Sequence, residues 1–213
     1  MNTSFRPPVR TVADLLRRLG DVPADRVRFD PVPGTATVAD LLRDENRRCE
    51  LLDDTLVEKP MGVRESFLAL VLAEMLNAHI RGRNLGILTG ADGTYELVSG
   101  LVRLPDLAFV SWDRLPGRRL PDEPVANVAP DLAVEILSAR NTPAEMARKR
   151  AEYFAAGVRV VWEIDPRARA ARVYTSGTDF TELTAADTLD GGAVLPGVVV
   201  PLANLFAELD RHG

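Results

Sequence analysis

Cysteine, histidine and long apolar runs are all scarce in this chain of 213 residues. The single cysteine, Cys49, cannot form a disulfide within the chain and is typical of a reducing compartment. The two histidines, His79 and His212, are too few for a zinc site built on histidine. No apolar run reaches the roughly 18 residues of a membrane span, and the N-terminus lacks the apolar core of a secretory signal peptide. We therefore expect a cytoplasmic protein that does not bind a membrane.

The sequence also lacks the motifs of several enzyme classes. Gly34, Gly86, Gly90 and Gly93 do not form the G-x-G-x-x-G pattern of a nucleotide-binding loop. Neither a nucleophilic serine elbow nor a cysteine–histidine pair can be assembled. The net charge of -5 and the pI of about 5.2 disfavour nucleic-acid binding that depends mainly on phosphate neutralisation, although a local basic surface remains compatible with them.

The chain does contain enough apolar sequence for a folded domain. Hydrophobic residues make up 46% of it, and its length suits one domain with an extension. The hexapeptide TVADLL begins at Thr11 and again at Thr37, and each threonine is an expected helix N-cap. Two similarly capped short helices explain this repeat, and so would a duplication. Because a proline- and glycine-rich linker follows the first copy, we expect an N-terminal helical extension and linker over residues 1–34 and the main domain over residues 35–213.

The rest of the chain alternates between strand and helix patterns. A hairpin is predicted over Cys49–Glu58, with Asp53 and Asp54 at its turn. The apolar face between Glu65 and Arg81 predicts the longest helix. Further strands are predicted, the first two joined by a GADG turn, at Leu85–Thr89, Thr94–Val98, Val102–Val110, Leu132–Leu137 and Val158–Ile164. The pattern indicates an α/β fold in which a helix joins the last two strands, so that these strands run parallel.

Glu135 is a carboxylate inside an apolar strand. Side chains alternate along a strand, so Glu135 shares one face with Ala133 and Leu137. Burying an unpaired carboxylate is costly because the charge loses its hydration. We therefore expect a cation to meet Glu135, either a bound metal or a nearby lysine or arginine.

The segment after this strand contains such a cation. Thr142 and Glu145 predict the capping box of a helix. Lys149 lies on the apolar face of that helix, so we expect it to lean toward the core. Asp106, which precedes another apolar run, can converge with Glu135 and Lys149.

The order of these residues resembles the PD-(D/E)xK nuclease superfamily: PD at positions 105 and 106, then glutamate in a strand, then lysine. The segments RCELLDDTLVEKP, LPDLAFVSW, LAVEILSARNT and KRAEYFAAGVRVVWEIDP are similar to the Uma-two type restriction-endonuclease-like family within it, over roughly residues 35–207. This resemblance implies a restriction-endonuclease-like core, with a mixed central β-sheet flanked by helices. Leu137 stands where the superfamily has its lysine. Such groups are thought to supply the lysine from the following helix, which implies Lys149.

The resemblance further implies a Mg²⁺- or Mn²⁺-dependent DNA endonuclease that forms a homodimer. Asp106, Glu135 and the backbone carbonyl of Ile136 would bind the metal, since hard oxygen ligands suit these ions. Lys149 would orient the attacking water or help to deprotonate it. Glu65, in the first turn of the long helix, would either join the metal site or be stabilised there by the helix dipole alone.

Simpler roles are open to the same residues. Asp106 could cap a turn, and Glu135 and Lys149 could form a buried ion pair. Lys149 could also pair with Glu145 one helical turn earlier. In that case the chain would be a catalytically silent relative that acts as a binding or dimerisation module. An RNA-directed or repair nuclease on the same scaffold is a third possibility.

Two further acids and one basic loop give weaker indications. Glu50 could be a metal-site acid, but it is more typical of an ion-pair partner at a strand edge. Glu163 is expected to pair with Arg159 or Arg172. A loop that could contact phosphates, or simply lie in solvent, contains Arg114, Arg118 and Arg119.

Overall fold

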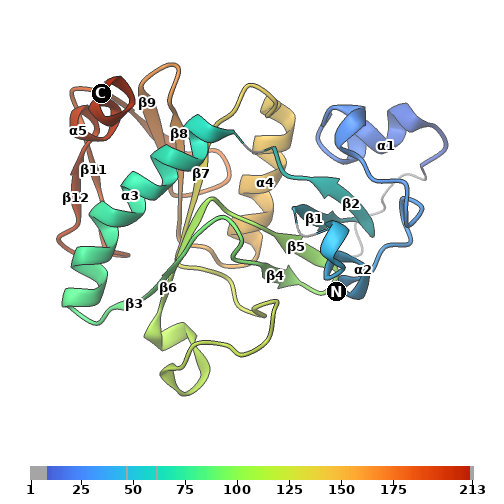
Figure 1. Cartoon of the computed structure of the whole chain (residues 1–213), viewed down its shortest axis with the longest axis horizontal. Helices are drawn as coiled ribbons and strands as arrows, with labels where there is room; N and C mark the ends of the chain where they lie inside the picture. Colours follow the sequence, from blue (N-terminus) through green and yellow to red (C-terminus); the bar gives the residue numbers. More distant parts are fainter. Residues whose placement is uncertain (1–8, 47, 61, 212–213) are drawn as a thin grey trace.

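The computed structural model describes residues 9–46, 48–60 and 62–211. It has a mixed α/β fold in which helices flank a central mixed sheet (Figure 1). No helix in the described part of the chain is long and apolar enough to cross a membrane.

The larger sheet has six strands in the order β10-β9-β8-β7-β6-β3. β7 and β8 run parallel, and all other neighbours in this sheet are antiparallel. The helix α4, Pro143–Ala155, joins β7 to β8, so the predicted crossover is confirmed. The six strands are β3 (Gly86–Thr89), β6 (Leu107–Ser111), β7 (Leu132–Ile136), β8 (Val160–Asp165), β9 (Ala170–Tyr174) and β10 (Phe180–Thr184).

A smaller sheet lies beside the larger one, with the strand order β2-β1-β5-β4. Its strands are β1 (Cys49–Leu52), β2 (Thr55–Glu58), β4 (Tyr95–Val98) and β5 (Leu101–Arg103). A separate antiparallel pair is formed by β11 (Thr188–Asp190) and β12 (Val199–Pro201).

Helices cover both faces of the larger sheet. α3 (Val63–Gly82) and α5 (Leu202–Ala207) share one hydrophobic cluster with the face that presents Leu132, Val134 and Ile136. Tyr153 of α4 belongs to the cluster on the opposite face, together with Ala133. The predicted alternation of side chains along β7 is therefore confirmed. The remaining helices are short: α1 (Val12–Arg18), α2 (Val38–Leu41), η1 (Ala24–Arg26), η2 (Asp44–Asn46), η3 (Trp112–Arg114), η4 (Pro116–Arg118) and η5 (Glu208–Asp210).

Local sequence signals determine several element boundaries. The predicted threonine N-caps of α1, α2 and α4 all form, and each side chain accepts a hydrogen bond from the backbone N–H three residues later. In the predicted hairpin of β1 and β2, Asp53 and Asp54 have φ values of 47° and 53°. Aspartate tolerates this left-handed conformation better than most residues, which explains the tight turn.

One predicted feature of the sheets is wrong. The continuous strand Val102–Val110 is instead divided into β5 and β6, which belong to different sheets. Pro105 lies in the break, and a proline has no N–H to contribute to a strand ladder. The strands on either side of the GADG turn do not pair with each other, because β3 pairs with β6 and β4 pairs with β5.

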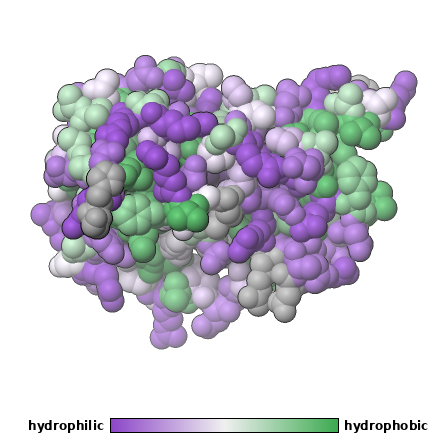
Figure 2. Space-filling view, turned by 45° about the horizontal axis from the view of Figure 1, so that its top comes forward, coloured by the Kyte–Doolittle hydropathy of each residue, from purple (hydrophilic) through white to green (hydrophobic). Residues whose placement is uncertain are grey.

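The N-terminal extension packs against the smaller sheet. Leu15, Leu19 and Val22 form a buried cluster with Leu52 and Val57 of the β1–β2 hairpin. Figure 2 shows a largely hydrophilic face, with hydrophobic residues gathered at the end of the molecule that the extension forms. Exposed apolar side chains at this end of the sequence include Val12, Phe29 and Val32. The extension is thus attached through one apolar face while another of its faces is open to solvent.

Candidate active site

The β7–α4–β8 crossover brings Glu135 and Lys149 together. Glu135 is on β7 and Lys149 is two turns into α4, and both side chains are buried. Lys149 Nζ donates to Glu135 Oε2 at 3.0 Å, and Tyr153 Oη donates to Glu135 Oε1 at 2.6 Å. The helix face that the sequence assigns to Lys149 therefore points at the predicted acid.

Asp106 joins this pair at the break between β5 and β6. Its Oδ2 accepts the backbone N–H of Ile136 at 2.7 Å, and its own N–H donates to the carbonyl of Val134 at 3.0 Å. These two bonds fix Asp106 beside the end of β7, next to Glu135. Its side chain remains 14% exposed, so the carboxylate is the part of the site nearest to solvent.

A second lysine, which sequence reasoning missed, faces Asp106. Lys59 Nζ lies 2.7 Å from Asp106 Oδ1. It is buried, and it has no partner with hydrogen-bond geometry among the described residues. A signal for it was present: Lys59 and Lys149 are the only two lysines in the chain, and all other basic residues apart from histidine are arginines. Both lysines lie at this one site.

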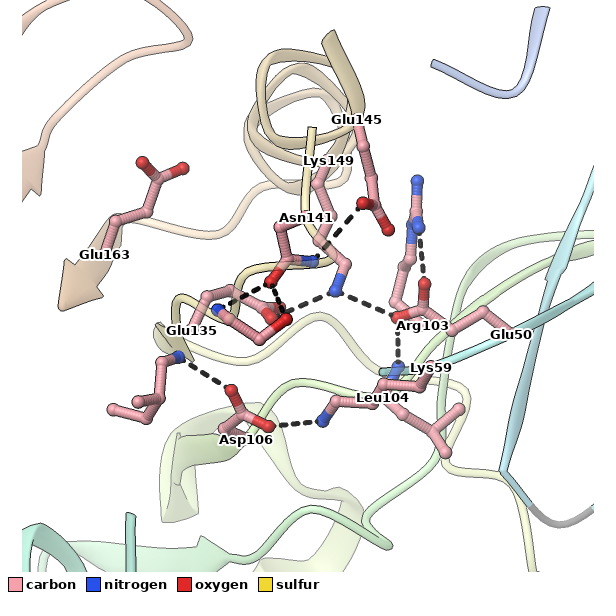
Figure 3. A network of polar contacts seen from close by, with 12 residues as sticks. Glu50, Lys59, Arg103, Leu104, Asp106, Glu135, Asn141, Glu145, Lys149 and Glu163 are labelled. Atoms are coloured by element: carbon pink, nitrogen blue, oxygen red, sulfur yellow. Dashed lines mark hydrogen bonds and ion pairs between the residues drawn. The ribbon is translucent and has the colours of Figure 1, made fainter. Parts of the chain in front are cut away.

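Glu50 forms the ion pair that the sequence favoured, but on β1, which is an inner strand of the smaller sheet rather than an edge strand. It is a buried acid on β1 whose Oε2 accepts from Arg103 at 2.6 Å and whose Oε1 lies 3.2 Å from Lys149 Nζ. It also accepts the N–H of Leu104 at 3.1 Å. Figure 3 shows Lys149 pointing from α4 into the space between Glu135 and Glu50, with Asp106 beyond them. We refer to Glu50, Lys59, Arg103, Asp106, Glu135 and Lys149 as the charged cluster.

Burial and charge act against each other within the charged cluster. Burial alone would raise the pKa of Glu50, but the charges of Lys149, Arg103 and Lys59 lower it to about 2. Burial raises the pKa of Glu135, and the negative charges of Asp106 and Glu50 add to that rise. Burial would lower the pKa of Lys149, yet Glu135 and Glu50 hold it above its ordinary value. Lys149 is therefore a charged donor rather than a base in this state.

A pocket opens beside Asp106. It has a volume of about 270 Å³, and its wall includes Glu65, Asp106 and Ile136 together with apolar residues of α3. Three of the four predicted metal ligands thus border one pocket. The fourth, Glu135, does not line the pocket, but the charge of Asp106 raises its pKa.

Two simpler pairings that the sequence left open do not form. Glu163 pairs with Arg150 at 2.6 Å instead of Arg159 or Arg172, and Figure 3 shows it pointing away from the charged cluster. Glu145 does not pair with Lys149, because both of its oxygens bind Arg26.

The remaining candidates lie apart from the charged cluster. Arg114 of the basic loop pairs with Asp131, while Arg118 is exposed. His79 bonds the carbonyl of Pro196 with its ring, and His212 lies outside the described residues.

The oxygen donors of this site suit a hydrated divalent ion. The described residues contain no group of three or more histidine, cysteine or acidic side chains arranged around a common point. Mg²⁺ needs no such cage, since it keeps several waters and binds through one or two carboxylates. Asp106, Glu135 and the carbonyl of Ile136 are donors of that kind. The Lys59 ammonium against Asp106 Oδ1 indicates that this side of the carboxylate accepts a cation. The residues therefore fit Mg²⁺ or Mn²⁺.

Comparison with known proteins agrees with this fold. The sequence profile of the Uma2 family, described as "Putative restriction endonuclease", matches residues 36–203. The crystal structure of "a putative nuclease belonging to DUF820" from Anabaena variabilis ATCC 29413 superposes with a TM-score of 0.71. The two chains are 17% identical, and the match covers 81% of this chain and 98% of the other, which establishes a shared fold. No curated protein matches the chain.

Proposed function

This chain belongs to the Uma2 family of restriction-endonuclease-like proteins, and from that premise we propose that it is a Mg²⁺- or Mn²⁺-dependent DNA endonuclease. Asp106, Glu135 and the carbonyl of Ile136 hold the metal, and Lys149 assists the attacking water. Glu65, on the wall of the same pocket, is a further candidate ligand through a bound water.

One contact supports this proposal most directly. Lys149 Nζ lies 3.0 Å from Glu135 Oε2 although it comes from the helix after the strand. The usual lysine position of the superfamily, two residues after the acid, holds Leu137. An ammonium group at this distance from the second acid restores the acid–lysine pair that the sequence pattern lacks.

The side chains divide the chemistry between them. A divalent ion held by Asp106, Glu135 and the Ile136 carbonyl would supply positive charge to offset the negative charge of the phosphoryl and leaving oxygens. Asp106 is held against Ile136 N–H, so its carboxylate and the Ile136 carbonyl belong to one rigid strand end. Lys149 stays protonated between two carboxylates. Its Nζ–H groups can therefore orient a water and offset developing negative charge, while the proton leaves to solvent or to a phosphate oxygen.

Cleavage of supercoiled and linear DNA with Mg²⁺ or Mn²⁺ tests this function. We expect the purified protein to cut, and Asp106→Asn, Glu135→Gln and Lys149→Met to lose at least about 100-fold in rate. Glu163→Gln is the matched control, because Glu163 is paired in register with Glu135 on the next strand but faces Arg150. It should cut at close to the wild-type rate. Full cleavage by Lys149→Met would refute the role of that lysine.

A second function, a silent binding or dimerisation module, is favoured by the charge balance of the cluster. Lys59, Lys149 and Arg103 face Glu50, Asp106 and Glu135, so these carboxylates already have protein cations as partners. Thermal stability separates the two functions. A metal-binding protein should gain stability on adding Mg²⁺ by mass action, about 2.7 kcal/mol at 100 times Kd, and Asp106→Asn should lose the gain. If Mg²⁺ does not raise the thermal stability and the protein does not cut DNA, the binding or dimerisation module is the better account.

Dimer formation belongs to both functions. We propose a homodimer, since a two-fold dimer matches a duplex that is cut on both strands. Light scattering at several protein concentrations measures this directly, and a monomer throughout would exclude paired cutting by a stable dimer.

A further inference from the structure

Arg26 of the N-terminal extension contacts both chain segments that carry the site lysines. It ends the short helix η1, and only 1% of its surface is exposed. Its Nε donates to the carbonyl of Glu58 at 2.7 Å, the residue before Lys59. Its two terminal nitrogens donate to Glu145 Oε2 and Oε1, at 2.9 and 2.6 Å, one helical turn before Lys149. Arg26 lies outside the family match at residues 36–203, yet it contacts residues that are close in sequence to both lysines.

The contact between Arg26 and Glu145 affects which carboxylate Lys149 pairs with. Glutamate four residues ahead of lysine is the favoured order for an ion pair along a helix. Glu145 is buried, and a buried carboxylate without a cation is strongly destabilising. Lys149 already acts on Glu145 through its charge. Without Arg26, Lys149 would be drawn back toward Glu145 and away from Glu135.

Other contacts hold the extension against the start of α4. Thr142 Oγ1 donates to the carbonyl of Gly20 at 2.6 Å, and Arg148 donates to the carbonyl of Arg18. A Cβ on Gly20 would lie 2.7 Å from Glu145 Cα, so the two backbones are in close contact. The extension and the start of α4 thus form a close interface in which Arg26 and Glu145 are both buried.

We propose that Arg26 is a positioning residue, which occupies both oxygens of Glu145 and so leaves Lys149 free to contact Glu135 and Glu50. This inference rests on the proposed function, in which Lys149 serves the cleavage reaction. In this proposal, the N-terminal extension helps to position Lys149 in the site.

The test compares Arg26→Leu with the double variant Arg26→Leu/Glu145→Gln in the full chain. Arg26→Leu should slow DNA cleavage on the order of 100-fold, because Lys149 is misplaced. Glu145→Gln in that background removes the competing carboxylate, so cleavage should recover to within about threefold of wild type. If Arg26 acted only by attaching the extension, the second substitution would restore nothing. Equal slowing in both variants, or none in Arg26→Leu, overturns the proposal.

A second measurement does not depend on cleavage. Because the chain has two lysines, ¹⁵N-lysine labelling gives two side-chain ammonium signals. Arg26→Leu should shift the Lys149 signal, and Arg26→Leu/Glu145→Gln should return it to its wild-type position. If the wild type cuts no DNA but these shifts occur, the proposed function fails and the positioning role stands. A Lys149 signal that is unmoved in Arg26→Leu refutes the positioning role whatever the activity.

Two further variants provide a control and a fallback for Arg26→Leu. Asp25→Ala is the matched control, since Asp25 is next to Arg26 and pairs with the exposed Arg140 without contacting Glu145. It should leave the Lys149 signal and cleavage unchanged, and a shift as large as that of Arg26→Leu would refute the proposal. If Arg26→Leu does not fold, Arg26→Gln retains a polar side chain but neither the charge nor the two-pronged contact. It should then shift the Lys149 signal in the same direction, and an unmoved signal would again refute the proposal.

Discussion

At the scale of single residues, lysine and arginine pair with carboxylates in different ways in this protein. Arginine forms fixed, two-pronged pairs, as between Arg26 and Glu145. A lysine ammonium is compact and can turn among several oxygens. Lys149 Nζ lies 3.2 Å from Glu50 and 3.0 Å from Glu135, so it contacts both carboxylates. Both lysines of the chain lie in the charged cluster, where Lys149 faces two carboxylates and Lys59 faces Asp106.

Glu50 gives this cluster a pH dependence with a definite sign. Its folded pKa of about 2 lies below the ordinary 4.5, so the carboxylate stabilises the folded state above pH 4.5. That contribution, roughly 3 kcal/mol, is lost as the pH falls through the folded pKa. We expect the gap in unfolding free energy between wild type and Glu50→Gln to narrow by about 2 kcal/mol between pH 5.5 and pH 3. Urea unfolding at both pH values measures it.

An exposed glutamate provides the comparison for Glu50. Glu182 pairs with Arg172 on the outer strands, and its side chain is 57% exposed. Glu182→Gln should differ from wild type by less than about 0.5 kcal/mol at either pH. A Glu50→Gln gap that stays constant over the same range would mean that the charged cluster does not hold Glu50 ionised.

At the scale of elements, the joint between the extension and α4 depends on a glycine. Gly20 has a φ of 91°, and a Cβ there would collide with the backbone of Glu145. Gly34 has a similar φ of 87°, but a Cβ there would meet nothing within 4 Å. We expect Gly34→Ala to lower the free energy of unfolding by about 1 kcal/mol through backbone strain alone. Gly20→Ala should cost about 3 kcal/mol or more, because overpacking adds to the same strain.

Thermal or urea unfolding of the two alanine variants separates these terms. If Gly20→Ala and Gly34→Ala lower the free energy of unfolding equally, the contact between the extension and α4 can accommodate a Cβ at position 20. If Gly20→Ala costs more and also shifts the Lys149 ammonium signal, the same joint both stabilises the fold and positions the site.

Elements with local causes could be predicted from the sequence. The threonine caps, the turn at Asp53 and Asp54 and the crossover around α4 each depend on residues within a few positions of one another. The break between β5 and β6 could not be read from the apolar pattern, since residues on both sides are buried. Pro105 was the available sign. Sheet partners, such as β6 for β3, depend on contacts that periodicity does not describe.

The same division applies to the candidate site. Glu135 and Lys149 are 14 positions apart within one crossover, so helix and strand geometry was enough to place them together. Lys59 and Glu50 reach the cluster from distant segments, and Arg26 contacts Glu145, which is 119 positions away. No local pattern encodes such contacts. The rarity of lysine was a compositional sign for Lys59, and nothing comparable marks one arginine among 24.

At the scale of the whole molecule, the distribution of charge limits how DNA can be bound. The net charge of -5 makes general attraction to phosphates weak. The basic loop follows β6, whereas Asp106 precedes it, so the five residues of that strand separate them by roughly 16 Å. In the proposed reaction, this loop would therefore contact phosphates away from the cleaved bond. It can add affinity without taking part in the reaction.

The three arginines of this loop should therefore behave differently. Arg114 donates to Asp131, to the carbonyl of Ala129 and to that of Gly157, so it ties the loop to the fold. Arg118→Ala/Arg119→Ala should weaken DNA binding and reduce the slope of log affinity against log salt by about 2, with unchanged thermal stability. Arg114→Ala should lower thermal stability and leave that slope unchanged. Titrating labelled duplex at several salt concentrations gives the slopes. An unchanged slope in the double variant would identify the loop as solvated surface, and DNA contacts would then have to come from the rim of the pocket beside Asp106.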